Sequence, residues 1–173
     1  MNLSSVQFRD RKLVETVKDA LELTGLPARQ LELEITETVL LQESEATLGT
    51  LHQLRSLGVR ISLDDFGTGY SSMSYLRSFP FDNIKIDQSF VRDLPDNLES
   101  VAIVRAVIGL SNSLGISVTA EGVETEAQAT YLAKEACTEL QGYLFSKAIP
   151  AKDILVLLEP LRALADACEP VGA

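Results

Sequence analysis

The sequence predicts an α/β fold in which a parallel sheet is covered by helices. Short apolar or alternating runs typical of strands alternate along the 173 residues with amphipathic segments typical of helices. About six such strand–helix units follow one another, and polar residues recur where the strands end. This is the arrangement of a TIM-type (β/α) barrel, so we predict a partial barrel of that type.

The individual elements follow from local patterns. Strands are expected at residues 2–6, 31–37, 60–63, 83–87, 116–121 and 139–143. Helices are expected at residues 11–24, 44–57, 71–77, 98–114, 126–136 and 152–158. Gly25, Gly58 and Gly115 end three of these helices. The helix over 98–114 is apolar around most of its circumference, so we expect it to be covered on two sides.

Composition limits the number of domains and the class of partner. With 46% hydrophobic and 23% charged residues, residues 1–173 are expected to form one domain with a sizeable core. Fifteen basic against 25 acidic residues give a formal net charge of −10, which argues against binding a nucleic-acid polymer or an anionic membrane. We expect no membrane span, no signal peptide and a cytoplasmic location. Cys137 and Cys168 lack the spacing of a metal site and are expected to be incidental thiols.

The apolar run that ends in Asp64 and Asp65 is the clearest candidate for a functional site. It opens into a turn bracketed by Gly67 and Gly69. Two adjacent carboxylates at a strand end repel each other, so if both are ionised a positive charge is expected between them. A metal ion is the simplest source of that charge.

Further polar residues recur at or near the carboxyl ends of the expected strands. With the aspartate pair, the set is Asn2, Glu34, Asp64, Asp65, Lys85, Glu121 and Gln141. Singly, each has a plain structural interpretation, such as a helix cap or a solvent-facing charge. Jointly they favour one pocket, because a barrel brings the carboxyl ends of its strands to one face. The only histidine, His52, lies in an expected helix and is predicted to be solvated, which disfavours Ser/His/Asp chemistry.

The chemistry of this set favours a hard cation. Carboxylate and amide oxygens are ligands for Mg²⁺ or Mn²⁺, whereas zinc prefers thiolate and imidazole. Two bridged cations would neutralise the aspartates and generate a hydroxide for attack on phosphorus. Lys85 would orient the attacking water or stabilise charge on the phosphate.

The ordered motifs resemble those of the EAL domain family, barrel phosphodiesterases that open the bacterial second messenger cyclic di-GMP to linear pGpG. The motifs are Asn2-Leu3-Ser4, Glu34-Ile35-Thr36-Glu37, Asp64 to Gly69, Lys85-Ile86-Asp87, Ala120 to Glu124 and Gln141-Gly142-Tyr143. The resemblance covers essentially the whole chain. It implies Mg²⁺ or Mn²⁺ held by Asn2, Glu34, Asp64, Asp65 and Glu121.

The resemblance also implies roles for other residues and for partners. Lys85, Glu121 and Asp65 are expected to act in catalysis, with Lys85 as the partner of the catalytic water, and Gln141 to contact the substrate. Supporting positions are Glu37, Gly67, Thr68, Gly69, Asp87 and Glu124. Glu37 is expected to brace the loop over 66–72 and to couple the metal site to dimer packing. A homodimer or other oligomer and an upstream signalling domain are therefore expected.

One motif of the family does not occur in this sequence. The Glu-Ala-Leu tripeptide, which supplies a further metal-ligating Glu, would precede Asn2. A complete barrel needs about 250 residues, so we expect the first two strands to be missing and the exposed edges to favour self-association. Two other functions stay open: a catalytically inactive cyclic di-GMP-binding or protein-interaction module and, more remotely, a metal-assisted enolising enzyme with Lys85 as the base.

Overall fold

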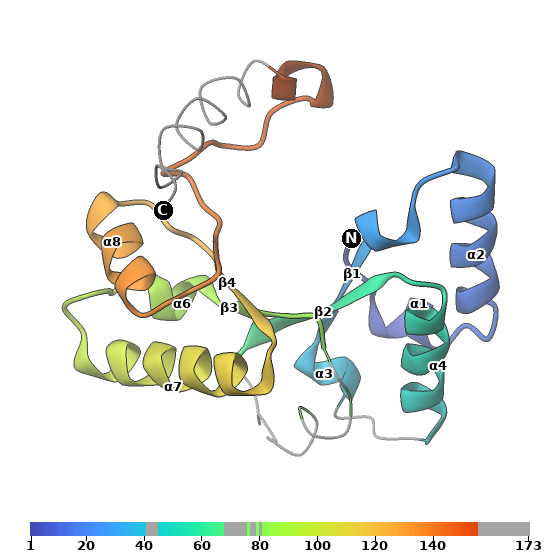
Figure 1. The fold of residues 1–173 in the computed structure, drawn as a ribbon, viewed down its shortest axis with the longest axis horizontal. Helices are drawn as coiled ribbons and strands as arrows, with labels where there is room; N and C mark the ends of the chain where they lie inside the picture. Colours follow the sequence, from blue (N-terminus) through green and yellow to red (C-terminus); the bar gives the residue numbers. More distant parts are fainter. Residues whose placement is uncertain (41–44, 68–75, 77–78, 80, 156–173) are drawn as a thin grey trace, which may run out of the picture.

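The computed structural model describes residues 1–40, 45–67, 76, 79 and 81–155 (Figure 1). Its centre is a sheet of five parallel strands in the order β1-β2-β3-β4-β5. The strands are β1 (Glu32–Thr36), β2 (Arg60–Phe66), β3 (Asn83–Ile86), β4 (Ser117–Ala120) and β5 (Glu139–Leu140). Asn2 adds an isolated parallel bridge to Glu34. Neighbouring parallel strands in sequence order confirm the predicted α/β fold of the barrel type.

Helices connect and flank the strands. They are α1 (Ser5–Phe8), α2 (Leu13–Thr24), α3 (Glu37–Leu40), α4 (Glu45–Ser56), α6 (Gln88–Val91), α7 (Leu98–Leu114) and α8 (Glu126–Lys134), with short 3-10 turns η1 (Ala28–Gln30) and η2 (Ala151–Asp153). In Figure 1, α4 and α7 lie on the same side of the curved sheet. Both helices contact it, α4 through β2 and α7 through β3 and β4.

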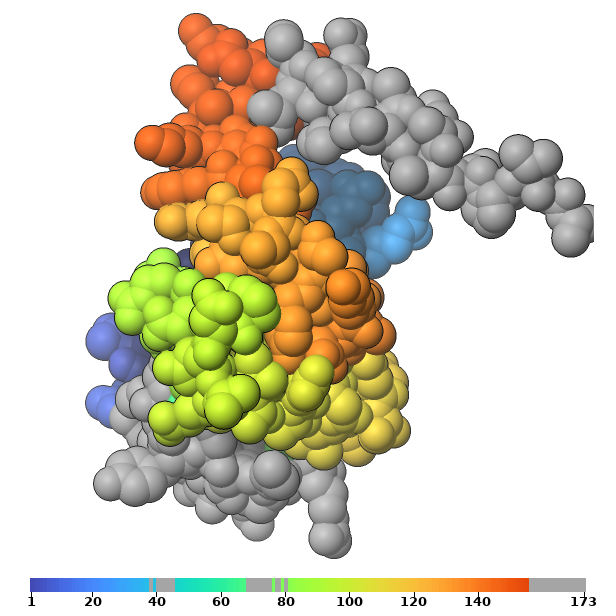
Figure 2. All heavy atoms as spheres, turned by 90° about the vertical axis from the view of Figure 1, so that its left-hand side faces the viewer, coloured from blue at the N-terminus to red at the C-terminus, as the bar shows by residue number. Residues whose placement is uncertain are grey.

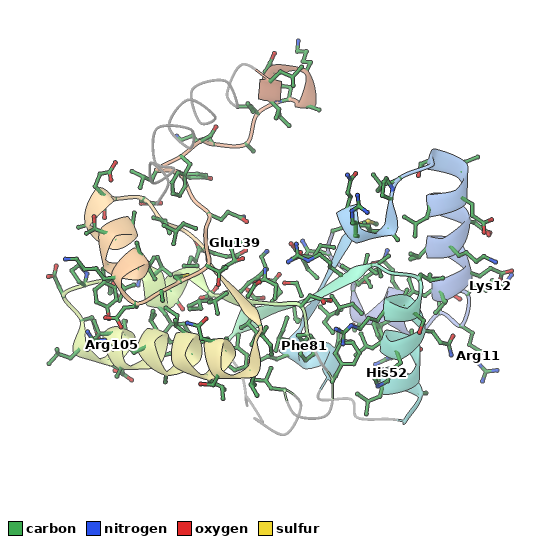
Figure 3. All side chains as sticks on the ribbon, in the orientation of Figure 1. Arg11, Lys12, His52, Phe81, Arg105 and Glu139 are labelled. Atoms are coloured by element: carbon green, nitrogen blue, oxygen red, sulfur yellow. The ribbon has the colours of Figure 1, made fainter. Side chains whose placement is uncertain are left out.

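The sheet has an apolar outer face and a polar inner face, as the alternation in the sequence predicts. Leu33 and Ile35 of β1 are buried, and the register places them beside Ile61 and Leu63 of β2. Complete burial of each such side chain contributes about 1.5–3 kcal/mol. The core continues to the aromatic rings near α4, where Phe81 packs edge-on against a neighbouring phenylalanine (Figure 3). The alternate residues therefore face the interior of the curved sheet.

The end of β2 departs from regular strand geometry. The register with β3 shifts between Leu63 and Phe66, and Asp65 has a left-handed φ of 55°. Aspartate tolerates this conformation better than most side chains. Gly67 follows with a φ of 99°, and its N–H donates to Oε1 of the buried Glu37 at 2.9 Å. The irregular backbone allows two consecutive aspartates to stand at one strand end.

Several predicted boundaries were wrong. Residues 2–6 do not form a strand, because Ser4 and Gln7 make a capping box that begins α1. The last strand stops at Leu140 instead of continuing to residue 143, since the backbone of Gly142 lies against the backbone of Val123.

The helices also differ in part from the prediction. The short helix α6 was not predicted, and Asp87 caps it by accepting the Ser89 N–H. Helix α7 has the predicted bounds and contacts both the sheet and α6, while Ala102 and Ala106 are exposed. The helix expected at 71–77 lies almost wholly outside the described residues, and the one expected at 152–158 lies partly outside them.

Candidate active site

Lys85 stands at the centre of a cluster of carboxylates from three other segments of the sheet. Its side chain is buried on the inner face of β3. Its Nζ lies 2.5 Å from Glu121 Oε1, 3.1 Å from Glu34 Oε1 and 3.7 Å from Asp64 Oδ1. We call these four side chains the acidic cluster. The sheet thus brings together residues separated by as many as 87 positions between Glu34 and Glu121.

The electrostatics of the acidic cluster are unbalanced. Three carboxylates share one ammonium group, which leaves two negative charges in excess. Burial alone would lower the pKa of Lys85, but the hydrogen bonds that it donates to Glu121 and Glu34 outweigh this effect and raise the pKa above its usual value. Burial raises the pKa of Glu121, and the charges of Asp64 and Glu34 add to that rise against the opposing effect of Lys85. A further positive charge would therefore be stabilised here.

Asp65 extends the negative charge beyond the four members of the cluster. Burial raises its pKa, and the nearby charges of Asp64 and Asp87 raise it further, while Lys85 lowers it. The Asp65 N–H donates to Asp64 Oδ1 at 3.1 Å. The predicted repulsion within the aspartate pair is thus present, and it acts beside a cation already shared by other carboxylates.

Asn2 supplies the amide oxygen expected of a metal site. In one orientation of its amide, the side-chain oxygen faces Glu34 Oε2 at 3.0 Å and Asp64 Oδ2 at 3.3 Å; in the other, the amide nitrogen donates to both. The first orientation gathers three oxygens that suit a hard divalent cation. Among the described residues, no group of three or more Asp, Glu, His or Cys side chains is arranged to hold a metal ion, since the carboxylates turn to Lys85 instead. The donor set nevertheless fits Mg²⁺ or Mn²⁺, because every candidate ligand atom is an oxygen.

The other predicted residues that the structure describes lie on the segments that follow the strands. The Gln141 N–H donates to the Ala120 carbonyl, and the side chain lines a cavity of about 260 Å³ together with Glu121 and Glu124. Glu37 and Gly67 are joined by the hydrogen bond described above. Asp87 and Glu124 line a second cavity of about 260 Å³. Thr68 and Gly69 lie outside the described residues.

A second group of inner-face side chains was not predicted from the sequence. Asn83 Nδ2 donates to Thr119 Oγ1 at 2.8 Å and lies 3.4 Å from Glu32 Oε1. Thr119 Oγ1 in turn donates to Glu139 Oε2 at 3.1 Å (Glu139 is labelled in Figure 3), and Arg60 Nε lies 3.4 Å from Glu32 Oε2. We call these five residues the polar network. Strand alternation was the available signal, because Asn83 precedes Lys85 by two positions.

The fold and the site define a (β/α)-barrel protein with an acidic site at the carboxyl ends of its strands. The family model described as EAL domain matches residues 1–148. MucR of Pseudomonas aeruginosa, named a bifunctional diguanylate cyclase/cyclic di-GMP phosphodiesterase, is 43% identical over 155 residues, which are 90% of this chain and 23% of that protein. The chain therefore belongs to the EAL domain family.

Solved structures agree with this assignment. The MucR phosphodiesterase in complex with c-di-GMP superposes with a TM-score of 0.84 at 42% identity, covering 88% of this chain and 62% of that chain. The EAL domain of Mycobacterium smegmatis DcpA gives 0.87 at 44% identity, with 92% and 71% covered. Klebsiella pneumoniae BlrP1, in a manganese and cy-diGMP complex, gives 0.79 at 36% identity, with 85% and 38% covered.

The relatives are longer than this chain. It spans only about a fifth of the length of the curated proteins that it matches first. Within the described residues, no helix has the length and apolar character needed to cross a membrane.

Proposed function

We propose that this protein is a metal-dependent cyclic di-GMP phosphodiesterase domain that opens the cyclic dinucleotide to linear pGpG. The observation that carries the proposal is the acidic cluster, in which Lys85 meets Glu34, Asp64 and Glu121 on the inner face of an EAL-type sheet. Its net negative charge suits the recruitment of divalent cations, which in turn suit an anionic phosphodiester. The names of MucR and of its c-di-GMP complex support this substrate.

We assign metal ligation to Asn2, Glu34, Asp64, Asp65 and Glu121. Support comes from the all-oxygen donor set, from its two excess charges and from the manganese in the BlrP1 complex. When bound, Mg²⁺ or Mn²⁺ would neutralise these carboxylates and activate a water for attack on phosphorus.

The chain's own residues have distinct roles in this proposal. Lys85 stays charged, because its pKa is raised by hydrogen bonds to Glu121 and Glu34 against the effect of burial, so it donates hydrogen bonds that orient the attacking water and stabilise charge on the phosphate. Glu121 and Asp65 are the carboxylates that we assign to accept the proton of that water. Gln141 contacts the substrate from the cavity that it shares with Glu121.

Supporting roles go to residues at the edge of the site. Glu37 holds the turn at Gly67, Asp87 fixes the start of α6, and Glu124 lines the adjoining cavity. We assign Thr68 and Gly69, which follow Gly67 in the sequence, a supporting role as well. We further propose that the domain, residues 1–173, is cytoplasmic, forms a homodimer or other oligomer and works with an upstream signalling domain, as the greater length of its relatives suggests.

The test is to incubate the purified chain with cyclic di-GMP and Mn²⁺ or Mg²⁺ and to separate the nucleotides by chromatography. Formation of pGpG that stops on chelation supports the proposal. Metal-dependent binding without hydrolysis would instead favour the inactive binding module. Absence of both binding and hydrolysis contradicts both functions. Light scattering during size-exclusion chromatography measures the oligomeric state independently.

A further inference from the structure

Gln128 of α8 is a polar residue buried away from the acidic cluster, with both ends of its amide engaged. The residue is only 5% exposed. Oε1 accepts the N–H groups of Glu124 at 2.8 Å and Thr125 at 3.0 Å, and Nε2 donates to the Arg92 carbonyl at 3.1 Å. Buried amides that satisfy backbone groups on two segments are costly to replace.

These hydrogen bonds connect the two segments that leave the active-site strands. Arg92 is the C-cap that directly follows α6, and α6 follows β3 and therefore Lys85. Glu124 belongs to the loop that follows β4 and begins with Glu121. Figures 1 and 2 show α6 and α8 side by side. Gln128 thus joins the segment after Lys85 to the segment after Glu121 by hydrogen bonds.

The two segments also pack closely. A Cβ atom added at Gly122 would lie 2.5 Å from the Gln88 Cβ, so the loop after β4 rests directly on α6. Two cavities share Gln88, Gly122 and Glu124 in their walls. A change in the distance between the segments would therefore alter the space beside Glu121.

Helix capping alone does not explain a glutamine at this position. Thr125 Oγ1 accepts the Gln128 N–H at 3.2 Å, which together with the Oε1 contacts forms a capping box. Glutamate serves equally well at this position of a capping box. Only the Nε2 bond to Arg92 requires an amide donor, so that bond is the specific contribution of glutamine.

We infer that Gln128 is a positioning residue: through Arg92 it fixes the loop after β4, and with it Glu121, relative to Lys85. The inference rests on the proposed phosphodiesterase function. The side-chain hydrogen bonds of Gln128 go to the backbone of Glu124, Thr125 and Arg92, none of which we assign as a metal ligand, so it acts through these backbone groups. Small displacements of a catalytic group reduce turnover more than they reduce binding.

The test compares two variants. Q128E keeps the capping box but loses the Nε2 donor to the Arg92 carbonyl, whereas T125A loses the capping hydroxyl but keeps that hydrogen bond to Arg92. A127E adds the same charge at the neighbouring exposed position as a control. In Q128E we expect kcat with cyclic di-GMP and Mn²⁺ to fall about tenfold with little change in KM, and Tm to fall by about 2–4 °C because the buried amide donor is lost. In T125A we expect Tm to fall by about 2–4 °C with kcat unchanged. A127E should resemble the unmodified protein.

Equal kcat in Q128E and the unmodified protein would overturn the inference. So would losses of kcat in Q128E, T125A and A127E that merely follow their Tm values. If the unmodified protein does not hydrolyse cyclic di-GMP, the proposed function fails, and hydrogen exchange of residues 121–125 decides the inference separately. Faster exchange in Q128E alone supports the positioning role of Gln128, and equal exchange in all three variants contradicts it.

Discussion

Two groups of polar side chains share the inner face of the sheet but balance their charges differently. In the acidic cluster, three carboxylates converge on the single ammonium group of Lys85. In the polar network, Glu32 is paired with Arg60, and Glu139 accepts a hydrogen bond from the hydroxyl of Thr119. Each carboxylate of the network therefore has a donor within the network, which carries one net negative charge, whereas the cluster carries two.

The difference separates the proposed metal site from the neighbouring residues that only stabilise the sheet. Both groups arise from the same strand alternation, and Asn83 and Lys85 lie two positions apart on β3. Among the described residues, Asn83 Oδ1 and Ser62 Oγ lack hydrogen-bond partners, but both atoms are uncharged. Unpaired neutral oxygens affect stability, whereas unpaired carboxylates attract cations. Mutations in the two groups should therefore have effects of different kinds.

The largest expected effect is the loss of activity in D64N, which removes one carboxylate charge from the acidic cluster. Hydrolysis of cyclic di-GMP should fall by about 100-fold or more, because altering even the residues around metal ligands costs about 10–100-fold. Manganese titration by calorimetry should show weaker binding. Hydrolysis within about threefold of the unmodified protein would contradict the assignment of Asp64 as a ligand.

The next expected effect is a pH-dependent loss of stability in K85M. Without the ammonium group, the clustered carboxylates repel one another, and their pKa values should rise on folding. The folded state then binds more protons than the unfolded state, so stability should fall as pH rises from about 5 to about 8. At neutral pH the loss should be roughly 2–3 kcal/mol.

The unmodified protein provides the control for K85M in urea unfolding at several pH values. Hydrogen bonds to Glu121 and Glu34 overcome the effect of burial and raise the pKa of Lys85 above its usual value, so its contribution is fully present throughout this pH range. The stability of the unmodified protein should therefore change less with pH than that of K85M. Adding Mn²⁺ should restore part of the stability that K85M loses. Stability of K85M that increased with pH would show that the carboxylates do not depend on Lys85.

A smaller effect, on stability alone, is expected for T119V in the polar network. The change removes the acceptor of the Asn83 amide and the donor to Glu139 while keeping the side-chain shape. Unfolding in urea should show a loss of about 1–2 kcal/mol, with manganese affinity unchanged. T24V removes an exposed hydroxyl that bonds the Ala20 carbonyl and should stay within about 0.5 kcal/mol of the unmodified protein. A larger change in manganese affinity than in stability would erase the distinction between the groups.

The sequence predicted the fold and the acidic cluster better than it predicted the surrounding residues that hold them in place. Alternation in β1 was sufficient to place Glu34 opposite Leu33 and Ile35, and recurrence at strand ends brought Lys85 and Glu121 to the same site. These features depend on local periodicity and on the common direction of the strands.

The features that were missed depend on contacts between distant segments. The role of Asn83 requires the register that brings Thr119 beside it, and the role of Gln128 requires α8 to lie against α6. The left-handed Asp65 follows from a register shift in β2 that no local pattern marks. Local patterns therefore identified the residues of the site, while the contacts between distant segments that position them depend on tertiary packing.

The smallest expected effect is that of R60Q, at the exposed edge of the polar network. Arg60 and Glu32 are 39% and 25% exposed at their side chains, so solvent and salt screen their interaction. The loss of stability should be at most about 0.5 kcal/mol and should shrink at high salt in urea unfolding, with manganese affinity unchanged. Glu32 would still lie near the Asn83 amide, which limits the cost. Weakened manganese binding in R60Q would show that the two groups are electrostatically coupled. If R60Q binds manganese normally while D64N binds it weakly, only the acidic cluster contributes to cation binding.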